Sequence, residues 1–211
     1  MTEYINKRLI HFSNASNIRS IPSFIDGLKP SQRIILLGAF KKWSSYNSAV
    51  GSIKVSQLGS YVSENFTYHY GDTSLQQTII GMAQSFVGSN NMNYFLDDGQ
   101  YGTRNMGGRD SGSPRYIYTL PEKWLYHVFH PDDETLLETF INENGHPEPK
   151  NLIPIIPMWA VNGGSGIGTG HSTFIPNYNP ENTVRYLLAK IDGKKTPNMK
   201  PWYRNFKGKL I

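Results

Sequence analysis

Residues Gly107 to Thr119 read GGRDSGSPRYIYT, a run of small residues that leads into an arginine–tyrosine pair and a short strand-like segment. Glycine and serine allow a backbone to bend and to approach a ligand closely. The pair Arg115–Tyr116 places a permanent cation beside a phenol, which is a possible oxygen nucleophile. Because a planar guanidinium binds phosphate oxygens well, the segment indicates a phosphate-binding site. The local pattern is equally compatible with a buried strand tyrosine and a solvated loop arginine.

The composition limits the classes of protein to which the chain can belong. It has 211 residues, of which 38% are apolar, enough for one domain or two small ones. The absence of cysteine excludes disulfides, thiolate metal sites and cysteine catalysis. No apolar run reaches the length of a membrane span, and the N-terminus lacks the order of a signal peptide, so we expect no membrane partner.

Charge is distributed unevenly along this chain of net charge +5. Residues 1–120 hold 11 Lys and Arg against 7 Asp and Glu, residues 121–150 hold 2 against 7, and residues 151–211 hold 8 against 2. A basic body with one acidic segment suits a partner that has a phosphate backbone, contacted by part of the surface. Ordinary surface charge is the alternative explanation.

Apolar spacing predicts four helices in the first half of the chain. Residues 3–14 are expected to bury an apolar stripe made of Tyr4, Ile5, Leu9, Ile10 and Phe12. Pro30 suits the first turn of a helix that runs to about Phe40. The third helix covers Lys54 to about Glu64, and Asp72 could cap the fourth. Two short helices joined by a polar turn are compatible with a helix-turn-helix, and also with any other helical hairpin.

The second half is predicted to mix strands and helices. Short strands are expected near residues 94–96 and 115–119, with a Gly- and Asn-rich loop before the second that is too long for an ordinary connection. Apolar spacing and proline positions predict the remaining elements. These are a helix from Pro121, a helix over 133–142, an extended run over 153–158 and a helix from Asn179–Pro180.

Gly163 to Gly170 read GGSGIGTG, a second glycine-rich loop, with Ile167 between two glycines. A protruding isoleucine could insert between base pairs from the minor groove of DNA, where apolar wedges of this kind are used. An ordinary turn with a packed isoleucine is the alternative. A P-loop fits poorly, because no Gly-Lys-Ser/Thr follows.

Three blocks of sequence resemble the type IIA DNA topoisomerases, most closely the eukaryotic and large-DNA-virus topoisomerase II. They are GQYGTR at 99–104, GGRD at 107–110 continued by SPRYI at 113–117, and RSIPSFIDGLKPSQR at 19–33. The resemblance implies an α+β fold, with a winged-helix domain (a helix-turn-helix plus a wing) over residues 1–155. The start of an α/β tower domain would follow over residues 156–211. It also implies that the chain is a fragment of a much longer enzyme.

The resemblance also assigns roles to individual residues. Tyr116, not Tyr118, would be the nucleophile that forms a transient 5′-phosphotyrosyl link to DNA, and Arg115 would assist the transition state. The residues placed at the DNA by the same resemblance are Arg19, Lys29 and Arg33 on the backbone, Tyr70 near the cleaved region, and Ile167 as the wedge. His69 is a possible DNA-binding residue without an assigned role. The family usually has histidine where this chain has Tyr70, which keeps a hydroxyl donor but loses a group that titrates near neutral pH.

Cofactors and partners also follow from the resemblance. Asp97–Asp98 and Asp132–Asp133–Glu134 are interpreted as loop and helix-start acids, so no metal site is expected in this chain. In the family, Mg²⁺ is held by a separate toprim domain and ATP by a separate ATPase. The full-length parent would act as a homodimer on double-stranded DNA in the nucleus, or at a viral replication site. Two alternatives remain: a non-catalytic winged-helix module that bends DNA, and a protein-interaction domain with an incidental basic face.

Overall fold

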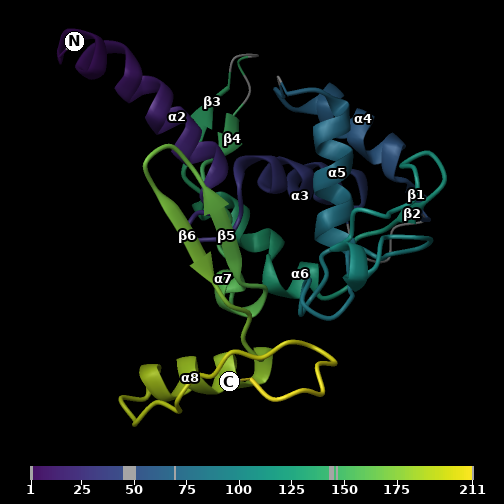
Figure 1. The fold of residues 1–211 in the computed structure, drawn as a ribbon, viewed down its shortest axis with the longest axis vertical. Helices are drawn as coiled ribbons and strands as arrows, with labels where there is room; N and C mark the ends of the chain where they lie inside the picture. Colours follow the sequence, from purple (N-terminus) through teal and green to yellow (C-terminus); the bar gives the residue numbers. More distant parts are fainter. Residues whose placement is uncertain (1, 45–50, 69, 143–144, 146, 211) are drawn as a thin grey trace.

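A computed structural model describes residues 2–44, 51–68, 70–142, 145 and 147–210. In the described residues, three two-stranded antiparallel sheets lie around a group of central helices (Figure 1). This is the α+β class expected from the sequence. No helix in this part of the chain has the length and the apolar character needed to cross a membrane.

Three helices form the centre of the molecule: α3 (Pro30–Lys42), α4 (Val55–Asn65) and α5 (Asp72–Ala83). The predicted ranges of α3 and α4 are confirmed to within two residues, and α5 is confirmed near its expected start, although Gly71, not Asp72, is its N-cap. The helices enclose a core that continues into the later segments, and its fully buried members include Ile35, Leu36, Leu58, Val62, Ile79, Phe95 and Leu125.

The small sheet beside these helices differs from the expected wing. Strand β1 (Ile53–Lys54) pairs with β2 (Tyr118–Thr119). The strand that follows the glycine-rich segment is therefore hydrogen-bonded to the residues that directly precede α4. The expected strand near 94–96 is reduced to isolated antiparallel bridges, Phe95 with Pro121 and Asp98 with Tyr118, beside β2.

The N-terminal helix is longer and more exposed than expected. It runs through α1 (Thr2–Tyr4), a π-helical turn (Ile5–Leu9) and α2 (Ile10–Ser20), and it projects from the body (Figure 1). The prediction that its apolar stripe is buried is wrong: Phe12 is 66% exposed and Tyr4 is 59% exposed. The stripe stays in solvent because the body meets only the C-terminal end of α2, which contacts α3 and β5.

The acidic segment also differs from expectation. A short helix α6 (Leu125–Val128) buries its apolar side as predicted, but it begins four residues after the expected start at Pro121, which instead forms a bridge with Phe95. The helix predicted over 133–142 is wrong, because a 3₁₀ helix (Pro131–Leu136) is followed by strand β3 (Thr139–Ile141). Pairing with β4 (Pro147–Pro149) overrides the helical spacing and leaves Ile141 68% exposed.

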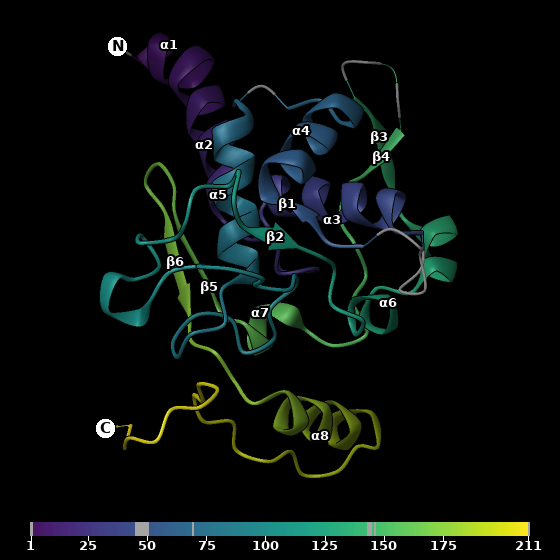
Figure 2. The ribbon, with the colours of Figure 1, turned by 90° about the vertical axis from the view of Figure 1, so that its right-hand side faces the viewer.

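The C-terminal part begins with α7 (Met158–Val161) and the hairpin of β5 (Gly164–Ile167) and β6 (Ser172–Ile175), and it ends with α8 (Pro180–Ile191) and an irregular segment. The predicted extended run over 153–158 is confirmed as non-helical except for Met158, which begins α7, and α8 begins at Pro180 as predicted. Figure 2 shows α8 and the segment after it as a layer beneath the rest of the chain.

Asn91 joins this layer to the body. Its Nδ2 donates to the carbonyl oxygens of Val161, Tyr178 and Trp202 at 2.9–3.0 Å. Val161 and Met158 already belong to the main core. The division into domains 1–155 and 156–211 stays a prediction.

Candidate functional site

The turn Pro114–Tyr116 carries the predicted nucleophile. The Tyr116 amide donates to the Ser113 carbonyl at 2.9 Å, which closes the turn. Its side chain is 76% exposed, and Arg115 beside it is also exposed. The interpretation of Tyr116 as a buried strand aromatic is therefore wrong. Among the described residues, neither the phenol nor the Arg115 guanidinium has a hydrogen-bond partner, so both are available to a ligand.

The backbone on either side of this pair is held by the first turn of α4. The amide of Ser56 donates to the Pro114 carbonyl at 3.0 Å, and the amide of Val55 donates to the Ile117 carbonyl at 3.1 Å. The first amides of a helix lack partners within the helix, so these two carbonyls satisfy groups that would otherwise be free. Ile117 is buried in the core. Arg115–Tyr116 is thus an exposed pair of side chains on a fixed backbone.

The glycine-rich loop before the turn is folded tightly upon itself. Asp110 accepts from the Thr103 amide and the Thr103 hydroxyl, both at 2.8 Å, and these bonds lower the pKa of the Asp110 carboxyl. A Cβ on Gly102 would lie 2.6 Å from the Gly108 backbone, so the two sides of the loop are in direct backbone contact at these glycines. The loop is therefore an ordered support for the turn.

Three other tyrosines of the chain are unsuited to act as nucleophiles. Burial raises the pKa of Tyr94 and of Tyr101 above the ordinary phenol value, and it raises the pKa of Tyr126 to about 12. The Tyr101 hydroxyl is also engaged, because it donates to the Tyr118 carbonyl at 2.7 Å. Tyr118 is 39% exposed against 76% for Tyr116. Exposure thus favours Tyr116 among these aromatic side chains.

A groove of about 620 Å³ lies on another part of the surface, between α2, the start of α3, the segment after α4 and the β3–β4 hairpin. The structure brings together in its wall five of the residues predicted to bind DNA: Arg19, Lys29, Arg33, Tyr70 and Ile167. Arg115 and Tyr116 are not part of this wall. His69, the sixth predicted DNA-binding residue, lies outside the described residues.

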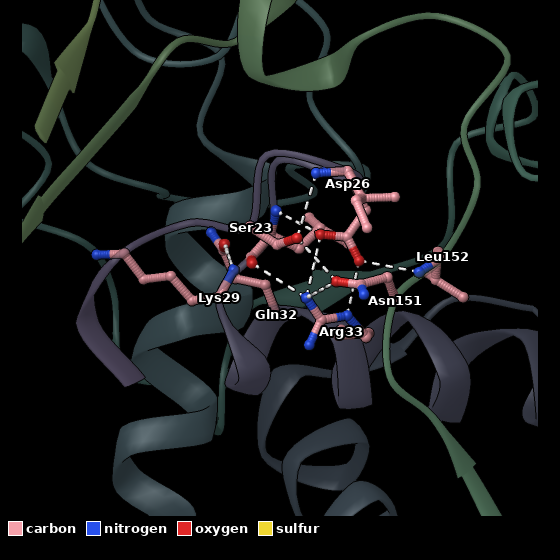
Figure 3. A network of polar contacts seen from close by, with 9 residues as sticks. Ser23, Asp26, Lys29, Gln32, Arg33, Asn151 and Leu152 are labelled. Carbon is pink, nitrogen blue, oxygen red and sulfur yellow. Dashed lines mark hydrogen bonds and ion pairs between the residues drawn. The ribbon is translucent and has the colours of Figure 1, made fainter. Parts of the chain in front are cut away.

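The two basic residues near the start of α3 have different environments (Figure 3). The Lys29 ammonium extends away from the polar network, and partial burial lowers its pKa. The Arg33 guanidinium is instead held in a buried ion pair, with its Nε 2.6 Å from Oδ2 of Asp26 and its Nη2 3.2 Å from the Leu28 carbonyl. Arg33 is therefore not a solvated charge, and its contact with DNA stays a prediction.

Ile167 is the most exposed large apolar side chain of the hairpin, at 85%. The alternative of a packed isoleucine is therefore wrong, and part of the expected loop is strand β5. Its neighbouring glycines allow β5 to lie against the end of α2. A Cβ on Gly166 would be 2.2 Å from the Ser20 carbonyl oxygen, and a Cβ on Gly168 would be 2.0 Å from Oδ1 of Asn17. Close backbone contact thus fixes Ile167 relative to Arg19.

Asp26 is the residue that the sequence did not single out for the site. It is fully buried, and besides Arg33 it accepts from the amides of Leu28 and Leu152, both at 2.9 Å (Figure 3). The local sequence around Asp26 indicates only a turn. Its partner Leu152 is 126 residues away in the sequence. No local pattern could have identified it.

Acidic side chains do not gather into a metal site within the described residues. There, no group of three or more His, Asp or Glu side chains is placed to hold a metal ion. Asp97 accepts from the Ser85 hydroxyl, and Asp132 lies beside the His130 ring. These acids do not form a site that fits Mg²⁺, so no step is assigned to the metal in this chain.

Comparison with known proteins agrees with the fold and with the motifs. Residues 19–210 match the family model that describes the A-type subunit of DNA gyrase/topoisomerase IV. The chain is 47% identical to DNA topoisomerase 2 of Bombyx mori and 50% identical to that of Arabidopsis thaliana, over 99% of this chain in both cases. It spans only 13% and 14% of those two proteins.

A solved structure is similar over almost the whole chain. It is the crystal structure of the Plasmodium falciparum topoisomerase II DNA-binding, cleavage and re-ligation domain, with a TM-score of 0.90 and 43% identity. The match covers 98% of this chain and 28% of that one. The chain therefore belongs to the DNA gyrase/topoisomerase IV family, and its fold is that of a type II topoisomerase DNA-cleavage domain.

Proposed function

We propose that this chain is the DNA-cleaving part of an ATP-dependent type IIA topoisomerase, in which Tyr116 forms a transient 5′-phosphotyrosyl link. The observation that supports this most directly is the exposed Arg115–Tyr116 pair on a backbone held by the first turn of α4. A nucleophile that must meet a large substrate needs an accessible oxygen in a fixed position. The similarity to topoisomerase II over 98–99% of the chain makes a purely architectural module or a protein-interaction domain less favoured.

The proposed step is a transesterification. The Tyr116 Oη attacks the phosphorus of a DNA phosphodiester, and the bond from phosphorus to the 3′ oxygen breaks. The phenol loses its proton, and the departing 3′ oxygen gains one. The guanidinium of Arg115 would stabilise negative charge on the phosphate as the new bond forms. Because one ester replaces another, the reverse reaction reseals the strand without a high-energy cofactor.

The groove lined by Arg19 and Lys29 would hold the DNA backbone. Contacts of this kind supply affinity and salt dependence but no sequence choice, which suits an enzyme that cuts many sites. Ile167 would insert between base pairs from the minor groove and bend the duplex. Tyr70 would contact the same DNA segment, and the assignments of Arg33 and His69 to DNA remain predictions.

The rest of the activity belongs to the parent enzyme. It would bind Mg²⁺ and ATP outside this chain, act as a homodimer so that each tyrosine holds one strand, and pass a second duplex through the break. The relatives are eukaryotic topoisomerase 2 proteins, which supports action on chromosomal DNA in the nucleus, and a viral replication site is the alternative location.

Covalent capture tests the proposal. The full-length parent is incubated with Mg²⁺ and labelled duplex DNA, denatured with detergent, and assayed for protein-linked DNA. Tyr116→Phe is expected to abolish the adduct, because phenylalanine has no nucleophilic oxygen. Tyr118→Phe, two residues further along the chain in β2, is the matched control and should retain it. An adduct that survives Tyr116→Phe would refute the assignment.

A further inference from the structure

Tyr70 lies against the one basic side chain of α2 that faces the groove. The guanidinium carbon of Arg19 is 4.9 Å from the centroid of the Tyr70 ring. Arg19 is in the last turn of α2, and Tyr70 precedes α5, so two elements far apart in sequence meet at this contact. Both side chains line the groove of about 620 Å³.

The ring of Tyr70 is itself supported. It packs edge-on against Tyr68, with ring centroids 5.4 Å apart and planes at 69°. The Tyr68 hydroxyl is 2.9 Å from the Ser74 hydroxyl in the first turn of α5. A chain of contacts therefore runs from α5 through Tyr68 and Tyr70 to the Arg19 guanidinium.

Within the described part of the chain, Arg19 has no carboxylate or carbonyl partner, and the Tyr70 ring is its contact. The acid in the groove wall, Glu148, is already engaged, because its Oε1 accepts from Nδ2 of Asn142 at 2.6 Å. An aromatic face attracts a cation through its quadrupole without accepting hydrogen bonds from the edge of the guanidinium. All five N–H groups of Arg19 therefore remain available to an anion.

We propose that Tyr70 is a positioning residue that holds the Arg19 guanidinium ready to bind a DNA phosphate. The inference rests on the proposed function and extends it, because it gives this tyrosine a role through Arg19 and not through its own hydroxyl. An arginine that is ordered before DNA arrives loses less side-chain entropy when it binds. A tyrosine also keeps this contact across the pH range in which a histidine would gain positive charge and repel the arginine.

Duplex binding by the 211-residue chain tests the inference, measured as fluorescence anisotropy of a labelled DNA over a range of salt concentrations. Tyr70→Leu is expected to weaken binding about two- to fivefold, the range of an exposed cation–π contact. Tyr70→Phe retains the ring and should bind like the wild type. Tyr4→Leu, which removes an exposed tyrosine outside the groove, is the matched control.

A double-mutant cycle separates a positioning role from a direct one. Arg19→Ala should weaken binding and reduce the salt slope by about one unit. In that background, Tyr70→Leu should have no further effect, since its partner is gone. Additive losses, or an equal loss in Tyr70→Phe and Tyr70→Leu, would overturn the inference.

The same titrations distinguish failure of this inference from failure of the proposed function. If the wild-type chain showed no salt-dependent binding, the proposed DNA interface would be refuted. If the wild type bound with a clear salt slope and Tyr70→Leu matched it, only the role of Tyr70 would be refuted.

Discussion

Asp26 and Arg33 form an ion pair that is closed to solvent, with Nε of Arg33 2.6 Å from Oδ2 of Asp26 and side-chain exposures of 10% and 0% for Arg33 and Asp26. The carboxylate also accepts from the amides of Leu28 and Leu152. One side chain thus joins the loop before α3, α3 itself and the segment between β4 and α7 (Figure 3). Lys29 at the start of α3 takes its position from this arrangement.

Removing the buried carboxylate should destabilise the chain strongly. Asp26→Ala leaves the Arg33 guanidinium buried without its counter-charge, and breaking a buried pair in this way costs about 3–5 kcal/mol. The loss in the free energy of unfolding is measured by urea titration, with circular dichroism as the signal. Glu138→Ala is the control, because the surface pair of Glu138 with Lys150 should contribute no more than about 1 kcal/mol. Equal effects of the two substitutions would contradict this interpretation.

Adding one methyl group at Gly166 should separate β5 from α2. The new Cβ would lie 2.2 Å from the Ser20 carbonyl oxygen and 3.0 Å from the Ile21 Cα, both backbone atoms that cannot move independently. We expect Gly166→Ala to lower the free energy of unfolding by about 1–3 kcal/mol, as overpacking does. Gly81→Ala, in the exposed face of α5 with no atom within 4 Å of the new Cβ, should instead stabilise by about 0.5–1 kcal/mol. Thermal unfolding of both variants checks that Gly166→Ala lowers the stability and that Gly81→Ala raises it.

Shortening Ile167 should affect DNA bending and leave stability unchanged. The side chain is 85% exposed, so Ile167→Ala should change the free energy of unfolding by less than about 0.5 kcal/mol. Energy transfer between dyes at the two ends of a short duplex should show less bending than with the wild type. Ile191→Ala, at a 79% exposed position on α8, is the control. Normal bending by Ile167→Ala would exclude a wedge at this position.

The link between Asp110 and Thr103 should be lost only in acid. Hydrogen bonds from Thr103 hold the Asp110 pKa below its ordinary value of 3.8. A lowered carboxyl pKa means that these bonds support the loop fully above pH 3.8 and are lost as the pH falls through the folded-state pKa. The Thr103 amide resonance should therefore titrate with a midpoint below 3.8, and Asp110→Asn should abolish the titration. A midpoint above 3.8 would show that the bonds do not form.

Helix positions in the first half were predictable because local signals agree with the tertiary packing. Pro30 begins α3 and apolar spacing places α4, and in both cases the side that the spacing marks faces the core. The same spacing failed for the N-terminal helix, whose apolar stripe has no described partner, and for residues 133–142. There the pairing of β3 with β4 supplies hydrogen bonds that local propensity does not anticipate.

The sequence by itself determined the family, the α+β class and the identity of the candidate residues, because motifs such as SPRYI and RSIPSFIDGLKPSQR are local strings whose chemistry can be read without coordinates. Only the tertiary structure decided that Tyr116 and Ile167 are exposed and that Arg33 is buried against Asp26. It also decided that Tyr70 lies against Arg19. Those environments depend on contacts between segments that are separate in the sequence, and exposure and pairing arise only when the chain brings such segments together.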